Sequence, residues 1–147
     1  TAGASTFEIT GVQLEVGDHA TDFEHRSFGD ELRRCQRYYY VHSDGALYNN
    51  TTIGMACYQT SSTAMVAVHF PVAMRARTSM TVWSGSNGYQ IYVNDGSDVL
   101  TGSTFSLLRD GYTTAQINIT SADGDAKAAG LLANRSSSSF IAFAAEL

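Results

Sequence analysis

Hydrophobic and polar residues alternate with a period of two over much of the chain. Clear alternation occupies four segments, residues 64–70, 80–83, 89–93 and 116–119. A period of two is typical of strands that bury one face. Clusters rich in Gly, Asn, Asp and Ser separate these segments and predict tight turns. Many short strands with regular turns predict an all-β fold, a β-sandwich or jelly roll.

Two further segments carry a strand pattern with a departure from simple alternation. Residues 140–147 are apolar in both phases, which predicts a strand buried on both faces. Phe7 to Val16 alternate, but the phase changes at Gly11. A β-bulge at Gly11 accounts for that change, so we expect a bulged strand here.

One short helix is expected at about residues 28–37. Ser27 is a suitable N-cap, and Asp30 with Glu31 would place negative charge in the first helical turn. Apolar residues follow at helical spacing, at Phe28, Leu32, Cys35 and Tyr39. The pattern predicts an amphipathic helix that packs against a sheet, with a strand beginning near Tyr38.

A hairpin with a turn at residues 85–88 predicts the best candidate binding site. Its core face would pair Ser84 with Tyr89, Val82 with Ile91 and Met80 with Val93. The opposite face would carry Trp83, Gln90, Tyr92 and Asn94. Aromatic rings beside amides suit a glycan, because rings stack on sugar C–H faces while amides bond hydroxyls. The alternative is that another strand, a second subunit or the rest of a longer chain covers this face, which is the commoner use of such residues.

Composition bounds the class of protein and its partners. The 147 residues suffice for one domain, residues 1–147, with a core that needs no disulfide or metal. The net charge of −5 disfavours nucleic acid and anionic membranes as partners. The two cysteines, Cys35 and Cys57, both fall in apolar surroundings, so we expect two buried free thiols.

The sequence carries no recognisable catalytic constellation. The histidines lack metal-ligand spacing, and no nucleophile elbow or phosphate-binding loop occurs. A glycan-degrading enzyme would need two facing carboxylates, and nothing brings together Asp22, Glu24, Asp95 and Asp98. We therefore expect no enzymatic activity, no cofactor and no metal.

Several motifs resemble a family of phage virion proteins. They are Val12–Gly17, Ala20–Thr21, Phe23–Ser27, Glu31–Leu32, Cys35–Tyr40, Phe70–Ala76 and Ala144–Leu147. In these motifs the chain is similar to the C-terminal regions of tail-fibre-like and other structural proteins of tailed phages, notably marine ones. Two departures are small: Ala145 stands where Asp is common, and a common proline is replaced near Thr78. The likeness is dense over residues 12–40, sparse to residue 76 and nearly absent over residues 77–140.

The resemblance implies a role at the surface of a virion. Such modules usually end a longer protein and are often trimeric, which agrees with a chain that begins at Thr1 rather than Met. We expect a homo-oligomer, with a trimer favoured, that contacts other virion proteins. The first hypothesis is the receptor-binding C-terminal part of a tail fibre, whose copies bind host-surface glycans by avidity. The alternative is a capsid decoration or head-fibre protein with a purely structural role.

Overall fold

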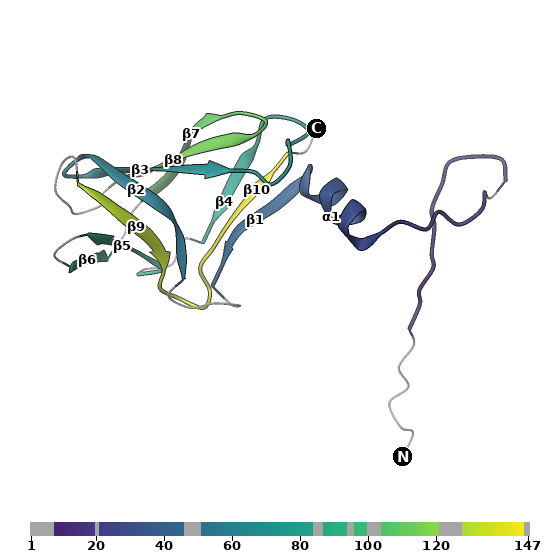
Figure 1. Ribbon diagram of the computed structural model, residues 1–147, viewed down its shortest axis with the longest axis horizontal. Coiled ribbons are helices and arrows are strands. Elements are labelled where there is room, and N and C mark those ends of the chain that lie inside the picture. Colours follow the sequence, from purple (N-terminus) through teal and green to yellow (C-terminus); the bar gives the residue numbers. More distant parts are fainter. Residues whose placement is uncertain are drawn as a thin grey trace, which may run out of the picture.

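Ten strands and one helix form the part of the chain that the computed structural model describes, residues 8–19, 21–45, 51–83, 87–93, 96–99, 104–120 and 128–145 (Figure 1). The elements are α1 (Phe28–Gln36), β1 (Tyr39–Asp44), β2 (Thr52–Thr60), β3 (Thr63–His69), β4 (Ser79–Val82), β5 (Tyr89–Val93), β6 (Gly96–Val99), β7 (Thr104–Asp110), β8 (Thr114–Thr120), β9 (Ala129–Asn134) and β10 (Phe140–Ala144). The expectation of an all-β sandwich with one short helix is confirmed.

The strands form two antiparallel sheets of unequal size. The smaller has the order β1-β10-β4, and the larger has the order β6-β5-β9-β2-β3-β8-β7. β10 lies at the centre of the smaller sheet, and its Ile141, Ala142 and Phe143 are all buried. The prediction that the last apolar segment is buried on both faces is therefore confirmed.

The core lies between the two sheets. Alternate residues of β2, β3 and β8 point inward, and Tyr58, Val66 and Ile117 are fully buried there. The smaller sheet contributes Phe143, whose ring meets that of Phe70 edge-on at 5.1 Å between centroids. Full burial of each such side chain contributes about 1.5–3 kcal/mol to folding. The period of two in the sequence therefore marks the inward face correctly in these strands.

Helix α1 begins where its capping signal predicts, but it does not pack against a sheet. The Ser27 hydroxyl accepts a hydrogen bond from the backbone amide of Asp30 at 3.2 Å. No residue of the helix is buried, and Phe28 is 82% exposed. The expected packing is wrong because the helix lies beyond the end of β1, where neither sheet faces it (Figure 1). Its apolar stripe is left in solvent.

Residues 8–19 and 21–26, which we term the N-terminal arm, extend away from the sandwich beyond α1 (Figure 1). The expected strand over residues 7–16 is not formed: Phe7 lies outside the described residues, and residues 8–16 pair with no strand. Gly11 adopts the left-handed region with a φ of 70°, where a side chain would be strained. The alternating pattern is real, but the described chain offers it no neighbouring strand.

Two further expectations are corrected by the sheet topology. The predicted hairpin is wrong, because β4 pairs with β10 in the smaller sheet while β5 pairs with β6 and β9 in the larger. The predicted burial of both cysteines is also wrong, since Cys35 and Cys57 are exposed. Cys35 lies on the unpacked helix, and Cys57 lies on the outward phase of β2, between the buried Ala56 and Tyr58.

Candidate functional site

The structure brings together only two of the four residues that the sequence suggested for a binding face. Gln90 and Tyr92 lie two residues apart on β5, and the Gln90 amide donates a hydrogen bond to the Tyr92 hydroxyl. Gln90 is buried, whereas Tyr92 remains 37% exposed. Asn94 lies outside the described residues. An exposed phenol beside an amide is a small polar and aromatic surface at this end of the larger sheet.

Trp83 does not join that surface, because it follows β4 in the other sheet. Its backbone amide donates to the carbonyl of Phe140 at 3.1 Å. Its ring lies against Gly88, where an added Cβ would come within 2.3 Å of a ring carbon. Trp83 is thus half-buried and held by packing, and the shared aromatic face that a hairpin would have built is not formed.

A second surface feature is a groove on the outer face of the larger sheet. It has a volume of about 810 Å³, and six of its lining residues point outward from β2, β3 and β8: Met55, Cys57, Met65, Ala67, His69 and Gln116. Cys57 lies directly opposite Met65 across β2 and β3, and Met55 is 73% exposed. We call this feature the outer-face groove. Its floor is apolar and carries sulfur side chains rather than charges.

A chain of side-chain hydrogen bonds borders the outer-face groove. Arg109 donates to Gln116 at 2.8 Å, and Gln116 donates to the Met65 sulfur at 2.9 Å and to Asn118 at 3.2 Å. Asp110, which also lines the groove, lies 3.9 Å from the guanidinium of Arg77. Gln116 is therefore fixed by its partners, and Arg109 supplies a positive charge beside an apolar floor.

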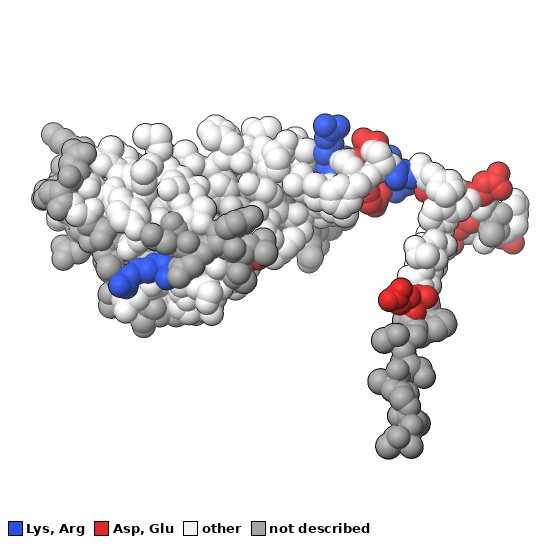
Figure 2. All heavy atoms as spheres, turned by 60° about the horizontal axis from the view of Figure 1, so that its bottom comes forward, with Lys and Arg blue, Asp and Glu red and all other residues white. Residues whose placement is uncertain are grey.

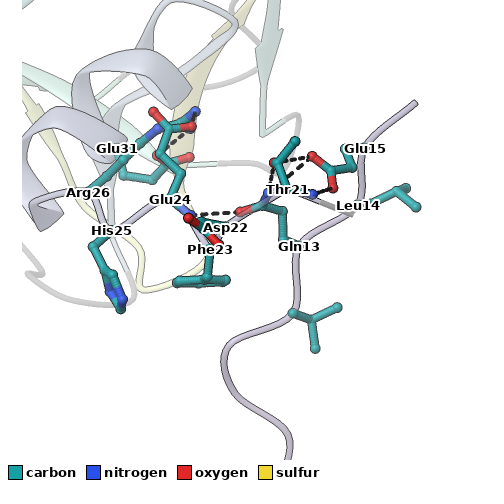
Figure 3. Close-up of a pocket in the computed structure, with 11 residues that line it drawn as sticks. Gln13, Leu14, Glu15, Thr21, Asp22, Phe23, Glu24, His25, Arg26 and Glu31 are labelled. Atoms are coloured by element: carbon teal, nitrogen blue, oxygen red, sulfur yellow. Dashed lines mark hydrogen bonds and ion pairs between the residues drawn. The ribbon is translucent and has the colours of Figure 1, made fainter. Parts of the chain in front are cut away.

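The N-terminal arm forms a third feature, a loop closed by side chains rather than by a backbone ladder (Figure 3). Glu15 accepts hydrogen bonds from the Thr21 hydroxyl at 2.6 Å and from the Thr21 backbone amide at 2.5 Å. The Gln13 carbonyl oxygen accepts from the backbone amide of Glu24 at 2.9 Å. Figure 3 shows Leu14 pointing away from these bonded residues. The arm thus pairs Gln13, Glu15 and Thr21 with one another, and Val12, Leu14 and Phe23 line the same hollow as these bonded side chains.

Ion pairs join the arm to the helix. Arg26 binds the carboxylate of Glu24 and, at 3.1 Å, that of Glu31 in the first turn of α1. The hydrogen bond from Arg26 lowers the pKa of the Glu24 carboxyl, and the hydroxyl and amide of Thr21 lower the pKa of the Glu15 carboxyl. Both groups are therefore ionised at neutral pH.

Charge is distributed unevenly between the arm and the sandwich. In the view of Figure 2, charged side chains gather along the arm and helix, while the visible face of the sandwich carries few. Five acidic residues and no Lys or Arg occur in residues 8–24. The arm is therefore an acidic extension that also carries exposed apolar side chains.

Two titratable groups are held inside the sandwich. Burial lowers the pKa of His42, whose Nδ1 lies 3.3 Å from the Tyr40 hydroxyl. Burial also raises the pKa of Tyr89. Among the described residues, no group of three or more His, Cys, Asp or Glu side chains could hold a metal ion, and no helix is long and apolar enough to cross a membrane. Tyr89 belongs to the hydrophobic core of the sandwich.

Sequence reasoning missed the outer-face groove, although a signal for it was present. Residues 52–60 carry apolar residues in both phases, and the outward phase holds Met55 and Cys57. A strand with large apolar residues on its outward face predicts that something covers that face. The alternation in the arm predicts a strand, but residues 8–16 form none.

Comparison of the chain with protein-family models, curated proteins and solved structures gives no match. The grounds for a function are therefore the geometry of the arm and groove, together with the sequence motifs described above.

Proposed function

We propose that this chain is a non-enzymatic structural module of a tailed-phage virion, which joins its assembly through the N-terminal arm. The sandwich would act as a rigid body, and the arm as the connector to neighbouring molecules. A homo-oligomer follows from this role, with a trimer favoured by the family resemblance. The proposed location is the surface of the particle, as an appendage or on the capsid exterior.

The exposed apolar side of the arm is the observation that carries this proposal. Leu14 is 98% exposed, Val16 is fully exposed and Val12 is largely exposed. Clustered apolar side chains of this size mark sites of protein association. Their polar neighbours Gln13 and Glu15 are already paired within the arm. A segment of this kind gains stability when a partner covers it.

The family resemblance supports the same conclusion from another direction. It is densest over residues 12–40, which form the arm, helix α1 and the start of β1. These are the residues that contribute least to the core of the sandwich. The motifs typical of virion proteins therefore coincide with the part of the chain that is free to contact other molecules.

Mass spectrometry of purified particles of the phage whose genome encodes this chain tests the proposal. We expect the chain in the particles at a stoichiometry typical of a structural protein, and an electron-microscopy map should place it at the surface. Absence of the chain from purified particles would overturn the proposal. A map that places the chain at the tail tip rather than on the capsid would assign it to an attachment fibre.

Attachment to a host-surface glycan is the second candidate function, and the Gln90–Tyr92 pair favours it. The exposed Tyr92 ring, fixed by the amide of Gln90, is suited to stack on a sugar. A glycan array with the intact chain, followed by adsorption assays with Tyr92→Ala and Trp83→Ala, tests it. Since Tyr92 is exposed and Trp83 is packed on Gly88, we expect Tyr92→Ala to reduce glycan binding without loss of folding. Unchanged binding and adsorption by Tyr92→Ala would remove this site.

A further inference from the structure

The N-terminal arm leaves the sandwich along a path that its anchoring contacts define. The Arg75 backbone amide donates to the Arg37 carbonyl at 2.8 Å, and the Ala145 amide donates to the Tyr38 carbonyl at 2.7 Å. The Arg75 guanidinium also lies over the Tyr38 ring, 5.1 Å from its centroid. These contacts fix the base of α1 at the end of the smaller sheet, and the helix and arm then point outward (Figure 1).

The apolar residues Val12, Leu14 and Val16 are exposed on the arm, and hydrogen bonds hold the polar residues between them. Val12, Leu14 and Val16 alternate with Gln13 and Glu15 along the arm, and all three apolar residues are largely or fully exposed. Gln13 and Glu15 are the residues that bond to Thr21 and Glu24 in the returning part of the arm. Gln13 and Glu15 are therefore paired within the arm, and the apolar residues that alternate with them stay exposed. Preorganisation of this kind lowers the entropic cost of docking.

The outer-face groove matches the arm in chemistry. Its apolar floor, with Met55 and Met65, is suited to branched aliphatic side chains, because unbranched thioethers adapt to irregular shapes. Its charges also complement those of the arm: Arg109 is exposed beside the floor, and Asp110 lies near Arg77. Residues 8–24 of the arm hold five acidic residues, and the one cation of the arm, Arg26, is paired with Glu24 and Glu31.

We propose that the arm of one copy docks in the outer-face groove of a second copy of this chain, with Val12, Leu14 and Val16 against Met55 and Met65. The proposal rests on the assembly role proposed above and names its partner. A second copy is favoured over the arm's own sandwich because the groove lies on the larger sheet, whereas the arm is anchored to the smaller one and points away from it. Exchange of arms between copies would cover both exposed apolar surfaces at once.

Crosslinking between two differently tagged full-length chains tests this arrangement. The donor chain carries Leu14→Cys with Cys35→Ser and Cys57→Ser, so its only cysteine is on the arm. The acceptor chain carries Cys35→Ser alone, so its only cysteine is Cys57 in the groove, which is exposed in the free chain. After mixing and treatment with a short bismaleimide, we expect a donor–acceptor product identified by mass. A matched control acceptor with Cys35→Ser, Cys57→Ser and Thr81→Cys, whose cysteine lies on the smaller sheet, should give at least several-fold less of it.

Two outcomes would overturn the inference. One is an equal yield of crosslinked product with the groove acceptor and with the control acceptor. The other concerns a chain that carries Leu14→Cys and Cys35→Ser and keeps Cys57. If this chain forms only links within one molecule, the arm folds onto its own groove. If the chain is present in purified particles and either result is obtained, arm exchange is refuted but the proposed function is not. Absence of the chain from particles would refute the proposed function instead.

Discussion

The phenolic hydroxyl of Tyr89 donates a hydrogen bond of 2.7 Å to the backbone carbonyl of Phe140. Tyr89 belongs to the larger sheet and Phe140 begins the central strand of the smaller one, so this bond joins the two layers of the sandwich. Tyr89 is almost fully buried. The hydroxyl therefore exchanges its contact with water for a partner on the opposite sheet.

Replacement of Tyr89 by Phe should lower the free energy of unfolding by about 1–2 kcal/mol, because the Phe140 carbonyl loses a buried donor. The ring itself is retained, so the apolar packing changes little. Chemical denaturation monitored by circular dichroism measures the difference. Tyr112→Phe is the matched control, since Tyr112 is exposed, and it should change stability by less than about 0.5 kcal/mol. Equal effects of the two substitutions would contradict the assigned role of the bond.

Alkaline pH should destabilise the protein through the same residue. Burial holds the pKa of Tyr89 above its ordinary value, so the folded state keeps a proton that the unfolded state releases near pH 10. The folded state then binds more protons than the unfolded state, and stability falls as the pH rises above about 10. Urea denaturation between pH 9 and 11 should show this fall, and Tyr89→Phe should reduce its slope. A parallel pH dependence in the variant would exclude Tyr89 as the cause.

Mildly acidic pH should destabilise the protein through His42. Burial lowers its pKa, so the folded state holds it neutral while the unfolded state binds a proton below about pH 6.5. The unfolded state then carries more protons, and stability falls as the pH drops. Thermal unfolding between pH 7.5 and 5.5 should show a decreasing Tm that His42→Phe makes less steep. An equally steep decrease of the Tm in His42→Phe would contradict the prediction.

Replacement of Gly88 by Ala should displace the Trp83 ring. An added Cβ would lie within 2.3 Å of a ring carbon, so the indole must move. We expect a loss of about 1–3 kcal/mol and a shift of the fluorescence of this single tryptophan. Gly29→Ala is the matched control: nothing lies within 4 Å of its added Cβ, and the helix should be stabilised slightly. Wild-type fluorescence in Gly88→Ala would show that Trp83 does not pack here.

The local elements of this fold could be predicted from the sequence, and the pairing of distant strands could not. Ser27 and Asp30 fix the start of α1, and the alternation that ends at Phe70 fixes the inward face of β3, because both signals act within a few residues. The partner of β4 is β10, about sixty residues away along the chain, and no local sequence signal predicts that pairing. The turn residues between β4 and β5 predicted a hairpin because a short connection usually joins neighbouring strands.

The candidate surfaces were visible in the sequence only as patterns. Alternation at Val12, Leu14 and Val16 shows that one side of this segment should be covered, but it does not show what covers it. The same is true of Met55 and Cys57, which lie in a strand that is apolar in both phases. Only the three-dimensional arrangement shows that these two sets of residues are both exposed and lie on different parts of the molecule.

Self-association of the chain through its arm is the central claim, and sedimentation velocity over a range of concentrations measures it most directly. The wild-type chain should form a concentration-dependent oligomer. Leu14→Asp should weaken association by about tenfold or more, because it replaces a side chain whose burial is worth about 1.5–3 kcal/mol. Thr81→Asp, which adds the same charge on the smaller sheet, should associate as the wild type does. A wild-type chain that stays monomeric at every concentration, or an unaltered oligomer in Leu14→Asp, would contradict the account.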